Sequence, residues 1–550
     1  MEQRKHIVCT FRTNSIHVLL HLVVYNSELI PESLQFYDTA EEPMRESFTT
    51  EETGQWVNRN HSISLSVERL VELWPPYPPR PTTVLTDVQA TADTVRRLIG
   101  QVRNAGGSMR AYGGGLSLSA VATSPHLMVN TRHLTLKYPI DYGCMDSKSS
   151  YHYSNLFYFQ CGTLLPEVYR YLEGRGRTLP TSGTCTNQTL GGAVSTGTHA
   201  SAHHFGSVSD AVVAIHVITG PEPDDVLWLE RATLPAVTHN FADRIGARLV
   251  RNDDLFNTAL ISFGSCGFVM GFLVNTIPLH KIKAVRRTIF VGSGLDHILQ
   301  TLDFDALHTF IPSVNSTSVN DVTFVVNPHN SNGTVHCTVM ERVELNTATI
   351  PAPANTDIRP GTNMLGVVGL VGNTSPELIP QSLHTLLDKS YKDVGPFVDT
   401  PVATYRQPTV FGMATSTEVG IPLQHTAAVL HLLRTIGTPL LNYAGIFAIR
   451  YIKQTRAFLG MAQFPITAVI ELPGVKCQGT HDFHKAVFHA LKSASVPFTF
   501  HWGMEMPEGP EALVHYGANK ERWIKARREL LGSNRTLFDN DVTRALGLSD

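Results

Sequence analysis

Between residues 83 and 280 the apolar positions alternate between helical spacing and short continuous runs. Over Asp87–Asn104 they recur at helical spacing, which predicts an amphipathic helix. Short apolar runs predict strands, and one more helical pattern lies among them. The strands are expected over Ser108–Tyr112, Leu127–Thr131, residues 154–163 and Asp210–Thr219, and the second helix over Leu164–Gly174. The segment therefore has the pattern of a compact α/β unit.

From about residue 280 to 480 strand-like runs alternate with longer helices. This mixture predicts an α+β domain with an antiparallel sheet. The runs are Val322–Val326, Val335–Arg342, Phe411–Ile421 and Ala444–Ile452, and the helices lie near Leu378–Asp388 and His425–Ile436. After this domain the pattern predicts a helix over Thr480–Ala494, a strand over Pro497–Trp502 and a helix over Glu511–Leu531.

The chain has 550 residues, too many for one ordinary core, so we expect two or more domains. The segment Trp74–Pro81, WPPYPPRP, is typical of an extended linker or domain entry. We therefore divide the chain into four parts. They are an N-terminal extension and entry segment over 1–74, a first domain over 75–280, a second domain over 281–480 and a C-terminal segment over 481–550.

Composition and charge exclude several classes of protein. A net charge of −3 gives no general attraction to nucleic acid or to an anionic membrane. The seven cysteines form no CxxC pair, so neither a zinc site nor a disulfide scaffold is indicated, and no metal is expected. The apolar run Ile16–Tyr25 is too short to span a bilayer and predicts a local strand or helix rather than a signal peptide or transmembrane segment. These features favour a cytoplasmic protein.

Two glycine-rich stretches carry the candidate chemistry. Thr181–His199, TSGTCTNQTLGGAVSTGTH, holds four glycines among eight Ser/Thr hydroxyls, and Arg110–Ser119 reads RAYGGGLSLS. Glycine lets backbone N–H groups approach a ligand closely, and hydroxyls add small donors. A surface loop is the alternative for the first stretch alone, but the second stretch favours a cradle for a flat, polar, anionic ligand. Arg110 would add charge to it, or else is a surface cation next to a strand.

The order of four motifs identifies a resemblance. RAYGGGLS, SGTCTNQTLGGAVSTGTHAS, FGSVSDAVVAIHVIT and FGSCGFVMGFLVN follow one another as in the FAD domain of the vanillyl-alcohol-oxidase-type flavoproteins. Within them the chain is most similar to the aldonolactone oxidase, aldonolactone dehydrogenase and alditol oxidase branch. Three later matches support this, at Glu418–Pro422 (EVGIP), Arg450-Tyr451 and His501–Gly503 (HWG).

The resemblance implies a fold, a cofactor and a set of binding residues. The fold would be α+β, with a two-part PCMH-type FAD-binding domain and an α+β substrate cap over it. FAD would be held by the two glycine-rich stretches, and His199 is either part of that site or a core histidine. The expected FAD-binding residues are Arg110, Tyr112, Gly113, Gly114, Gly115, Leu116, Ser117, Gly183, Cys185, Thr189, Gly192, Ser195, Gly197 and His199.

The chain departs from the family at the flavin-linking position. Many members carry a histidine where this chain has Leu116, and leucine forms no bond to the flavin. We therefore expect non-covalent FAD. Cys185 lies at the spacing of the flavin-linking cysteine of the berberine-bridge-type members, so a cysteinyl bond is the competitor, with a small buried thiol as the plain alternative.

It also departs at two catalytic positions. The carboxylate of the family's E-x-R strand is Ala448 here, and the lysine of its HWGK turn is Met504. Arg450 keeps its place and would stabilise a developing alkoxide, with a structural ion pair as the alternative. Glu418 on a cap strand would serve as base, unless it is only salt-bridged. His501 is the third candidate, although packing beside Trp502 would also explain it.

Together these features predict an FAD-dependent oxidase or dehydrogenase that acts on a CH–OH group. Hydride would pass to flavin N5 from a sugar lactone, a polyol or another secondary alcohol, and oxygen or another acceptor would reoxidise the flavin. The alternative is an FAD-binding protein with a non-redox role, such as a cyclase, a lyase or a non-catalytic binder. A pure interaction protein with an empty cradle is a third class.

Overall fold

The computed structural model describes residues 5–13, 16–24, 49–76, 84–183, 187–290, 292–329, 333–352, 379–405, 414–437 and 443–549. The chain forms two compact units, residues 1–45 and 46–550. In the first unit, strands β1 (Lys5–Thr13) and β2 (Ile16–Val24) pair antiparallel, so the apolar run near residue 16 is a strand. None of the helices in the described ranges combines the length and the apolar character needed to cross a membrane.

The second unit begins with a four-stranded sheet, in the order β3-β4-β6-β5. Its strands are β3 (Thr49–Val57), β4 (Ser64–Leu73), β6 (Leu127–Asn130) and β5 (Met109–Tyr112). Helix α1 (Val84–Asn104) packs on it through the predicted apolar face, with Val88, Val95 and Ile99 in the same cluster as Val71 and Val129. The predicted helix is confirmed and starts three residues earlier, at Val84 rather than Asp87.

The sheet pairing crosses the boundary predicted at residue 74. Strand β4 pairs in parallel with β6, and β3 pairs with β4, so residues 49–73 share a sheet with β5 and β6 of the part predicted to bind FAD. Strands β3 and β4 are rich in polar residues, so their place in the sheet depends on pairing with β6, a strand more than fifty residues later in the sequence. We call residues 49–278 the FAD half.

A six-stranded sheet follows, ordered β12-β11-β10-β13-β8-β7. Its strands are β7 (Lys137–Pro139), β8 (Leu156–Gln160), β10 (Val212–Ile218), β11 (Val226–Glu230), β12 (Arg248–Arg251) and β13 (Phe268–Asn275). Helices α2 (Leu165–Glu173), α3 (Leu190–Thr196), α4 (His239–Arg244) and α5 (Asp253–Leu260) connect its strands. Strands β9 (Arg177–Thr178) and β14 (Ile277–Pro278) form a separate two-stranded antiparallel sheet. In sequence, β9 follows α2 and β14 follows β13.

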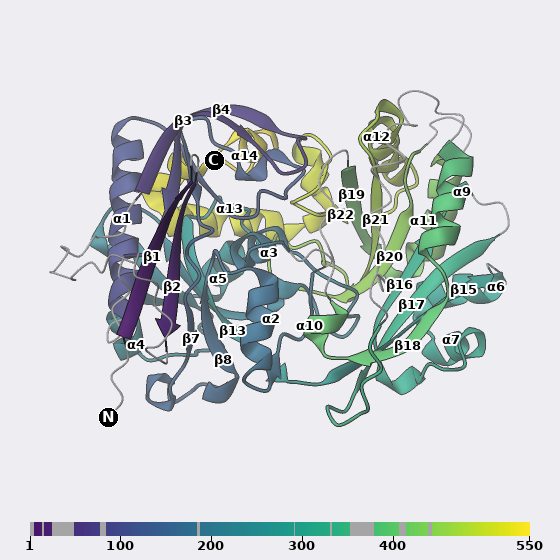
Figure 1. The fold of residues 1–550 in the computed structure, drawn as a ribbon. Coiled ribbons are helices and arrows are strands. Elements are labelled where there is room, and N and C mark those ends of the chain that lie inside the picture. Colours follow the sequence, from purple (N-terminus) through teal and green to yellow (C-terminus); the bar gives the residue numbers. More distant parts are fainter. Residues whose placement is uncertain are drawn as a thin grey trace. The chain divides into compact units, whose positions relative to one another are not determined.

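The second half of the unit is built on an eight-stranded sheet, ordered β18-β15-β17-β16-β20-β21-β19-β22, in which every pair is antiparallel, as predicted. Its strands are β15 (Lys281–Phe290), β16 (Val319–Val326), β17 (Thr334–Val343), β18 (Val394–Asp399), β19 (Ala414–Pro422), β20 (Phe447–Lys453), β21 (Ile466–Val475) and β22 (Thr499–Phe500). Figure 1 shows this sheet in teal and green, to the right of the FAD half.

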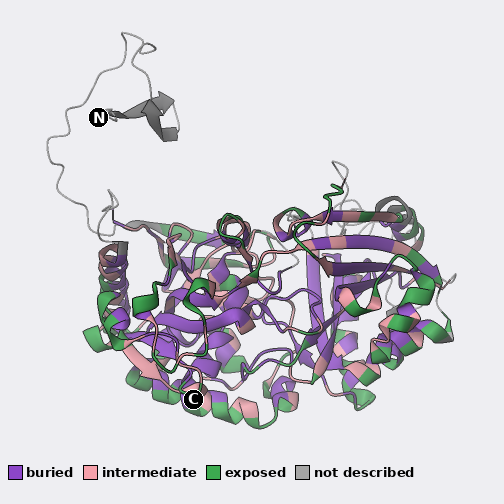
Figure 2. Cartoon of the chain, turned by 90° about the horizontal axis from the view of Figure 1, so that it is seen from below, coloured by how far each residue is buried: buried purple, intermediate pink, exposed green. Residues whose placement is uncertain are grey.

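One face of this cap sheet is covered by its own helices. The helices of this half are α6 (Ser293–Thr301), α7 (Phe304–Phe310), α9 (Ile379–Ser390), α10 (Pro401–Thr404), α11 (Thr426–Gly437) and α12 (Gln478–Ser493). Val322, Phe324 and Val326 of β16 share a buried cluster with α6, α11 and α12, while Thr323 and Val325 face the other way, into a cavity. Figure 2 shows buried strands inside and exposed positions on the outer faces of the helices.

The C-terminal segment returns to the FAD half. Helix α13 (Ala518–Leu531) packs on α5, where the indole N–H of Trp523 donates to the Thr258 carbonyl at 3.2 Å. Phe263 stacks on Trp523 and on Trp502. The last helix is α14 (Asp541–Ala545). The predicted helix over Glu511–Leu531 is divided at Gly517, which has a φ of +54° and precedes α13.

Candidate functional site

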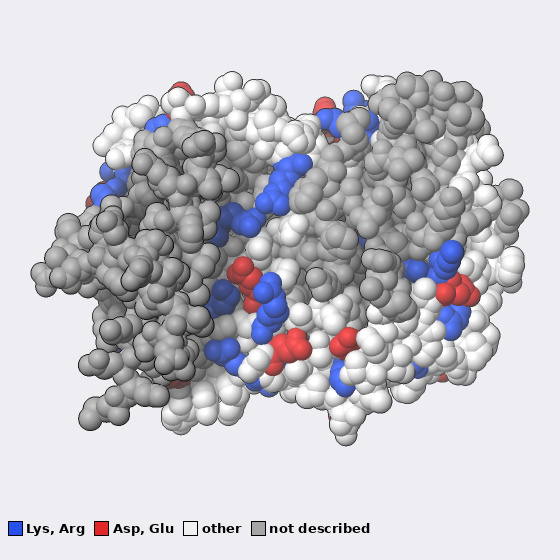
Figure 3. All heavy atoms as spheres, viewed as in Figure 1, with Lys and Arg blue, Asp and Glu red and all other residues white. Residues whose placement is uncertain are grey.

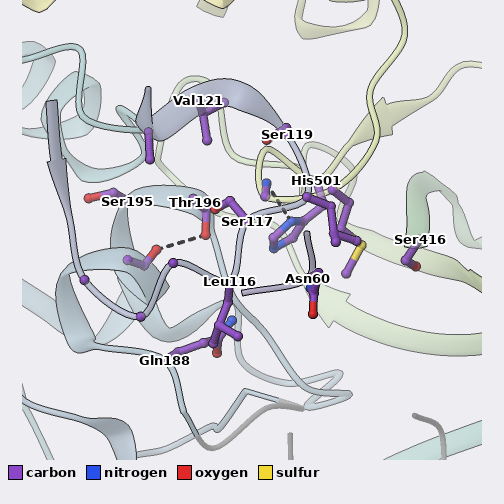
Figure 4. A pocket seen from close by; sticks show the side chains of 18 of the residues that line it. Asn60, Leu116, Ser117, Ser119, Val121, Gln188, Ser195, Thr196, Ser416 and His501 are labelled. Atoms are coloured by element: carbon purple, nitrogen blue, oxygen red, sulfur yellow. Dashed lines mark hydrogen bonds between the residues drawn. The ribbon is translucent and has the colours of Figure 1, made fainter. Parts of the chain in front are cut away.

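A single cavity runs from the glycine-rich turn of the FAD half to the open face of the cap sheet. Its lining includes residues from β5 and the following turn, from α3, from β16, β20 and β21, and from the turn after β22. Figure 4 shows Leu116, Ser117 and Thr196 around the same space as His501, with Ser416 of β19 beyond it. The cavity therefore joins a predicted cofactor site to a predicted catalytic site.

The two glycine-rich stretches meet in this cavity. A Cβ on Gly113 would lie 2.2 Å from Thr189 Oγ1, and one on Gly114 would lie 2.8 Å from the Asn187 carbonyl oxygen. Thr189 in turn caps α3, because its hydroxyl accepts the Gly192 N–H at 3.2 Å. The turn after β5 and the start of α3 thus form one backbone surface, on which only glycine leaves room for the contact.

The β3–β4 turn is hydrogen-bonded to the glycine turn. The Arg59 N–H donates to the Gly115 carbonyl at 2.8 Å, and Asn58 Nδ2 donates to the Ser117 carbonyl at the same distance. Trp56 and Asn60 line the cavity themselves. These four residues were not expected in the site, because nothing in the polar sequence before residue 60 indicates this pairing.

Nine of the predicted FAD-binding residues line the cavity. They are Tyr112, Gly113, Gly114, Gly115, Leu116, Ser117, Thr189, Gly192 and Ser195. Gly183 and Gly197 do not line it and shape the cradle instead. A Cβ on Gly183 would lie 2.5 Å from Thr198 Cγ2, and Gly197 ends α3 with a φ of +80°. Cys185 lies outside the described residues.

Arg110 lies away from the cavity lining. It is fully buried next to Gly264, and none of its three guanidinium nitrogens has a hydrogen-bond partner among the residues that the structure describes. Burial, together with the charge of Arg527, lowers the pKa of Arg110 to about 9. The structure therefore gives no support to direct contact between Arg110 and a ligand in the cavity.

His199 joins the FAD half to the cap instead of facing the cavity. Its Nε2 lies 3.2 Å from Glu418 Oε2, and both side chains are buried. Burial lowers the pKa of His199, but the Glu418 carboxylate outweighs it, so the pKa is raised. Burial alone would raise the pKa of Glu418, but the charge of the facing His199 outweighs burial and holds the pKa of Glu418 below its usual range. The two groups therefore form a buried ion pair.

Arg450 links two carboxylates on neighbouring strands. Its Nη1 lies 2.5 Å from Glu471 Oε2 and 3.4 Å from Glu418 Oε1. Burial lowers the pKa of Arg450, but the charge of Glu471 outweighs it and the pKa is raised. Arg450 and Glu471 line the cavity, whereas Glu418 does not. The hypothesis that Glu418 is the base is therefore not supported, because both of its oxygens are engaged outside the lining.

Glu471 is the charged residue that the sequence patterns missed. It lies in β21, within the sequence ITAVIELPGV, in which it is the only charged side chain. A lone carboxylate in a buried apolar strand is a signal in itself, since burying an unpaired charge is costly. The strand register places it opposite Ala448, the position at which the family carboxylate is absent.

His501 is presented to the cavity by the turn that follows β22. The Gly503 N–H donates to His501 Nδ1 at 3.0 Å, and Gly503 is itself held by the Leu118 N–H, which donates to its carbonyl at 2.8 Å. Burial lowers the pKa of His501 to about 4, so the ring is neutral near pH 7. With Nδ1 acting as acceptor, the neutral ring carries its proton on Nε2.

Comparison with known proteins gives an independent result. Residues 88–222 match the model of the FAD binding domain family FAD_binding_4. D-arabinono-1,4-lactone oxidase from Candida glabrata is 28% identical over 130 residues, and that from Debaryomyces hansenii is 24% identical over 202. These segments cover 24% and 36% of this chain, and 21% and 33% of the two relatives. The chain thus matches a fifth to a third of the relatives' length.

The fold is shared with solved structures. A cholesterol oxidase from Brevibacterium sterolicum superposes with a TM-score of 0.63 at 12% identity, over 93% of this chain and 100% of that one. A solvent-stable cholesterol oxidase gives a TM-score of 0.60, also at 12% identity, over 91% and 98%. At this identity the likeness concerns the fold.

The residues present fit the cofactor that the family model implies. Backbone glycines at 113, 114 and 191 leave space that a Cβ would fill, and Ser117, Ser195 and Thr196 supply hydroxyls along the same lining. The Gly113–Ser117 turn and the start of α3 would hold FAD. Residues 88–222 therefore match an FAD-binding domain, and the chain as a whole shares its fold with the cholesterol oxidase structures.

Proposed function

We propose that the protein is an FAD-dependent oxidoreductase that oxidises a CH–OH group to a carbonyl. The observation that carries this proposal is the single cavity that joins the FAD-binding turns to Arg450, Glu471 and His501. Bound FAD supplies the hydride acceptor for this chemistry. The name of the relatives, D-arabinono-1,4-lactone oxidase, supports the same class of donor.

The protein side chains supply binding, charge and proton transfer. Arg450 carries a permanent positive charge beside the cavity and would stabilise negative charge that develops on the substrate oxygen. His501, with its proton on Nε2, would donate a hydrogen bond to the same oxygen. Glu418 contacts the guanidinium of Arg450 as well, and Glu418 is itself held by His199.

The walls of the cavity favour an alcohol with an apolar body among the expected substrate classes. Apart from Arg450 and Glu471, no side chain in the described lining carries a full charge at neutral pH. The cap contributes the apolar side chains of Val325, Ile446 and Pro473 together with Met504, and hydroxyls lie between them, at Thr323, Thr338, Thr415 and Ser416. The apolar side chains bury hydrocarbon, and the separate hydroxyls fit isolated polar groups of a substrate.

Positive and negative side chains both lie along the middle of one face (Figure 3), which fits the net charge of −3. The substrate is therefore expected to be selected by the cavity rather than by the overall charge of the protein.

Anaerobic reduction of the bound flavin tests the function. The purified yellow protein is mixed without oxygen with sugar-derived lactones, with polyols and with secondary alcohols that carry an apolar body. We expect at least one alcohol to bleach the flavin absorbance, and members of the apolar group to do so fastest. FAD that stays oxidised with the whole panel would instead favour a non-redox role. Subsequent admission of air or of an artificial acceptor distinguishes an oxidase from a dehydrogenase.

A further inference from the structure

The cavity wall contains one carboxylate, among the residues that the structure describes, and it belongs to Glu471. We propose that Glu471 is the catalytic residue that accepts the hydroxyl proton of the substrate, taking the place of the carboxylate that is missing at Ala448. The inference rests on the function proposed above, since it assigns the proton acceptor of that reaction.

The strand register shows how a neighbouring strand can supply the carboxylate that Ala448 lacks. Glu418 of β19, Glu471 of β21 and Ala448 of β20 form one row across three neighbouring antiparallel strands. Directly opposite residues on such strands lie on the same face, about 5 Å apart. Glu471 therefore presents a carboxylate from the strand next to Ala448, within reach of the same side of Arg450.

The contact with Arg450 supports this placement. Arg450 Nη1 lies 2.5 Å from Glu471 Oε2, which is closer than its 3.4 Å contact with Glu418. Glu471 keeps 11% of its side chain exposed, whereas Glu418 keeps 1%. Of the two carboxylates, only Glu471 is both paired with Arg450 and accessible from the cavity.

The other candidates for the proton acceptor fail on chemistry. Both oxygens of Glu418 are occupied, by His199 and by Arg450, and its side chain lies behind the lining. His501 accepts the Gly503 N–H at Nδ1, so the nitrogen left for a substrate already carries a proton and donates. Arg450 stays protonated throughout. Glu471 is the remaining group that both faces the cavity and can take a proton.

The proposed step balances in atoms and electrons. The carbinol C–H bond would break, and its hydrogen would leave the alcohol as hydride with two electrons, which FAD would accept when bound. The O–H bond would break, its proton would pass to the Glu471 carboxylate, and the electron pair left on oxygen would form the C=O double bond. The alcohol would thus lose two electrons to FAD, and Arg450 would remain beside the oxygen as the counter-charge.

Relocating the carboxylate tests the assignment. Anaerobic flavin reduction by an alcohol that reduces the wild type is measured in Glu471→Gln, Glu471→Asp, Glu471→Ala and the double variant Ala448→Glu/Glu471→Ala. We expect Glu471→Gln and Glu471→Ala to slow reduction by about 10²- to 10⁴-fold, the range for loss of a general base. Glu471→Asp keeps a carboxylate, so its rate should lie between those of the wild type and of Glu471→Ala. The double variant Ala448→Glu/Glu471→Ala should reduce the flavin at least about tenfold faster than Glu471→Ala. Glu344→Gln removes an exposed carboxylate that follows β17 and should match the wild type.

Readouts that do not depend on turnover accompany the rates. FAD affinity, thermal unfolding and binding of the ketone product are measured in every variant. We expect Glu471→Gln to keep FAD affinity and ketone binding close to wild type, and to unfold at a lower temperature because Arg450 loses its nearer partner. If Glu471→Gln loses FAD, the rates of flavin reduction in Glu471→Asp and Glu471→Ala are compared instead. Equal rates in these two variants would overturn the role of Glu471.

The outcomes separate the two proposals. A wild-type protein that is reduced while Glu471→Gln reduces as fast overturns the role of Glu471 alone. A relocated carboxylate that restores nothing also counts against it, provided that the double variant binds FAD and ketone normally. A wild-type protein that no alcohol reduces overturns the proposed function, and the role of Glu471 with it.

Discussion

Gly113 and Thr189 lie so close together that a Cβ on the glycine would come within 2.2 Å of the threonine hydroxyl oxygen. The contact joins the turn after β5 to the start of α3, two segments separated by more than seventy residues. Thr189 is held from the other side as well, because its hydroxyl accepts the Gly192 N–H that begins the helix. The FAD cradle therefore depends on this contact for its shape.

Gly113→Ala should weaken FAD binding. The added methyl group has to displace Thr189 or bend the turn, and overpacking of this kind costs about 1–3 kcal/mol. At 1.4 kcal/mol per tenfold, the dissociation constant of FAD should rise about 5- to 140-fold. Titration of the apoprotein with FAD, followed by flavin fluorescence, measures it. Gly143→Ala is the matched control, because nothing lies within 4 Å of its Cβ, and it should bind FAD normally.

Much of the fold could be predicted because it follows from local patterns. Helix α1 has a continuous apolar face, and the strands of the cap carry apolar runs of the expected length. The β3–β4 hairpin could not be predicted in this way. Its strands are polar over much of their length, and they become part of a sheet only by pairing with β6, whose sequence position gives no hint of the partner.

The buried pair of His199 and Glu418 should make stability depend on pH. The pKa of His199 is raised above its usual 6.5, so its contribution is complete below about pH 6.5 and is lost as the pH rises through the folded-state pKa. The pKa of Glu418 is lowered from 4.5, so its contribution is present above that value and is lost in stronger acid. The pair therefore stabilises the fold most between about pH 4.5 and 6.5.

His199→Gln tests this linkage. Breaking a buried ion pair by removing one partner costs about 3–5 kcal/mol, and Arg450 still faces Glu418, so we expect about 3 kcal/mol at pH 6. The difference from wild type should shrink as the pH rises above 6.5. Urea unfolding at pH 6 and pH 9 measures it, with His489→Gln on the exposed side of α12 as control. A difference that stays constant with pH would show that the pair is not ionised.

The flavin should be bound without a covalent link. Leu116 lies in the cavity at the position where the sequence resemblance would place a linking histidine, and leucine has no group to form the bond. Acid precipitation should therefore release all of the yellow colour into the supernatant. Flavin that stays in the pellet of the wild type, and is released in Cys185→Ala, would show a cysteinyl bond instead.

Sequence motifs predict only part of the catalytic end of the cavity. A strand motif predicts Arg450, which lines the cavity. Glu418 came from a similar motif, yet its side chain is directed to His199 and Arg450. A strand pattern shows which residues share a face, but only the register between strands shows which of them meet, and Glu471 was missed for that reason.

His501 provides the last prediction, because its hydrogen bond fixes what it can do. The Gly503 N–H occupies Nδ1, and the pKa of about 4 keeps the ring neutral, so Nε2 remains a donor across the neutral range. The ring should therefore stabilise charge on the substrate oxygen rather than take its proton.

His501→Phe should slow flavin reduction by about 10²- to 10³-fold, the cost of losing one donor to a developing oxyanion. His501→Asn keeps a donor and should retain more of the rate than His501→Phe. Because the wild-type ring does not titrate between pH 6 and 8, its removal should lower the rate by the same factor throughout that range. His489→Phe on α12 controls for the loss of a histidine. A loss confined to the upper part of the range would indicate that His501 acts as a base, with the proton on Nδ1.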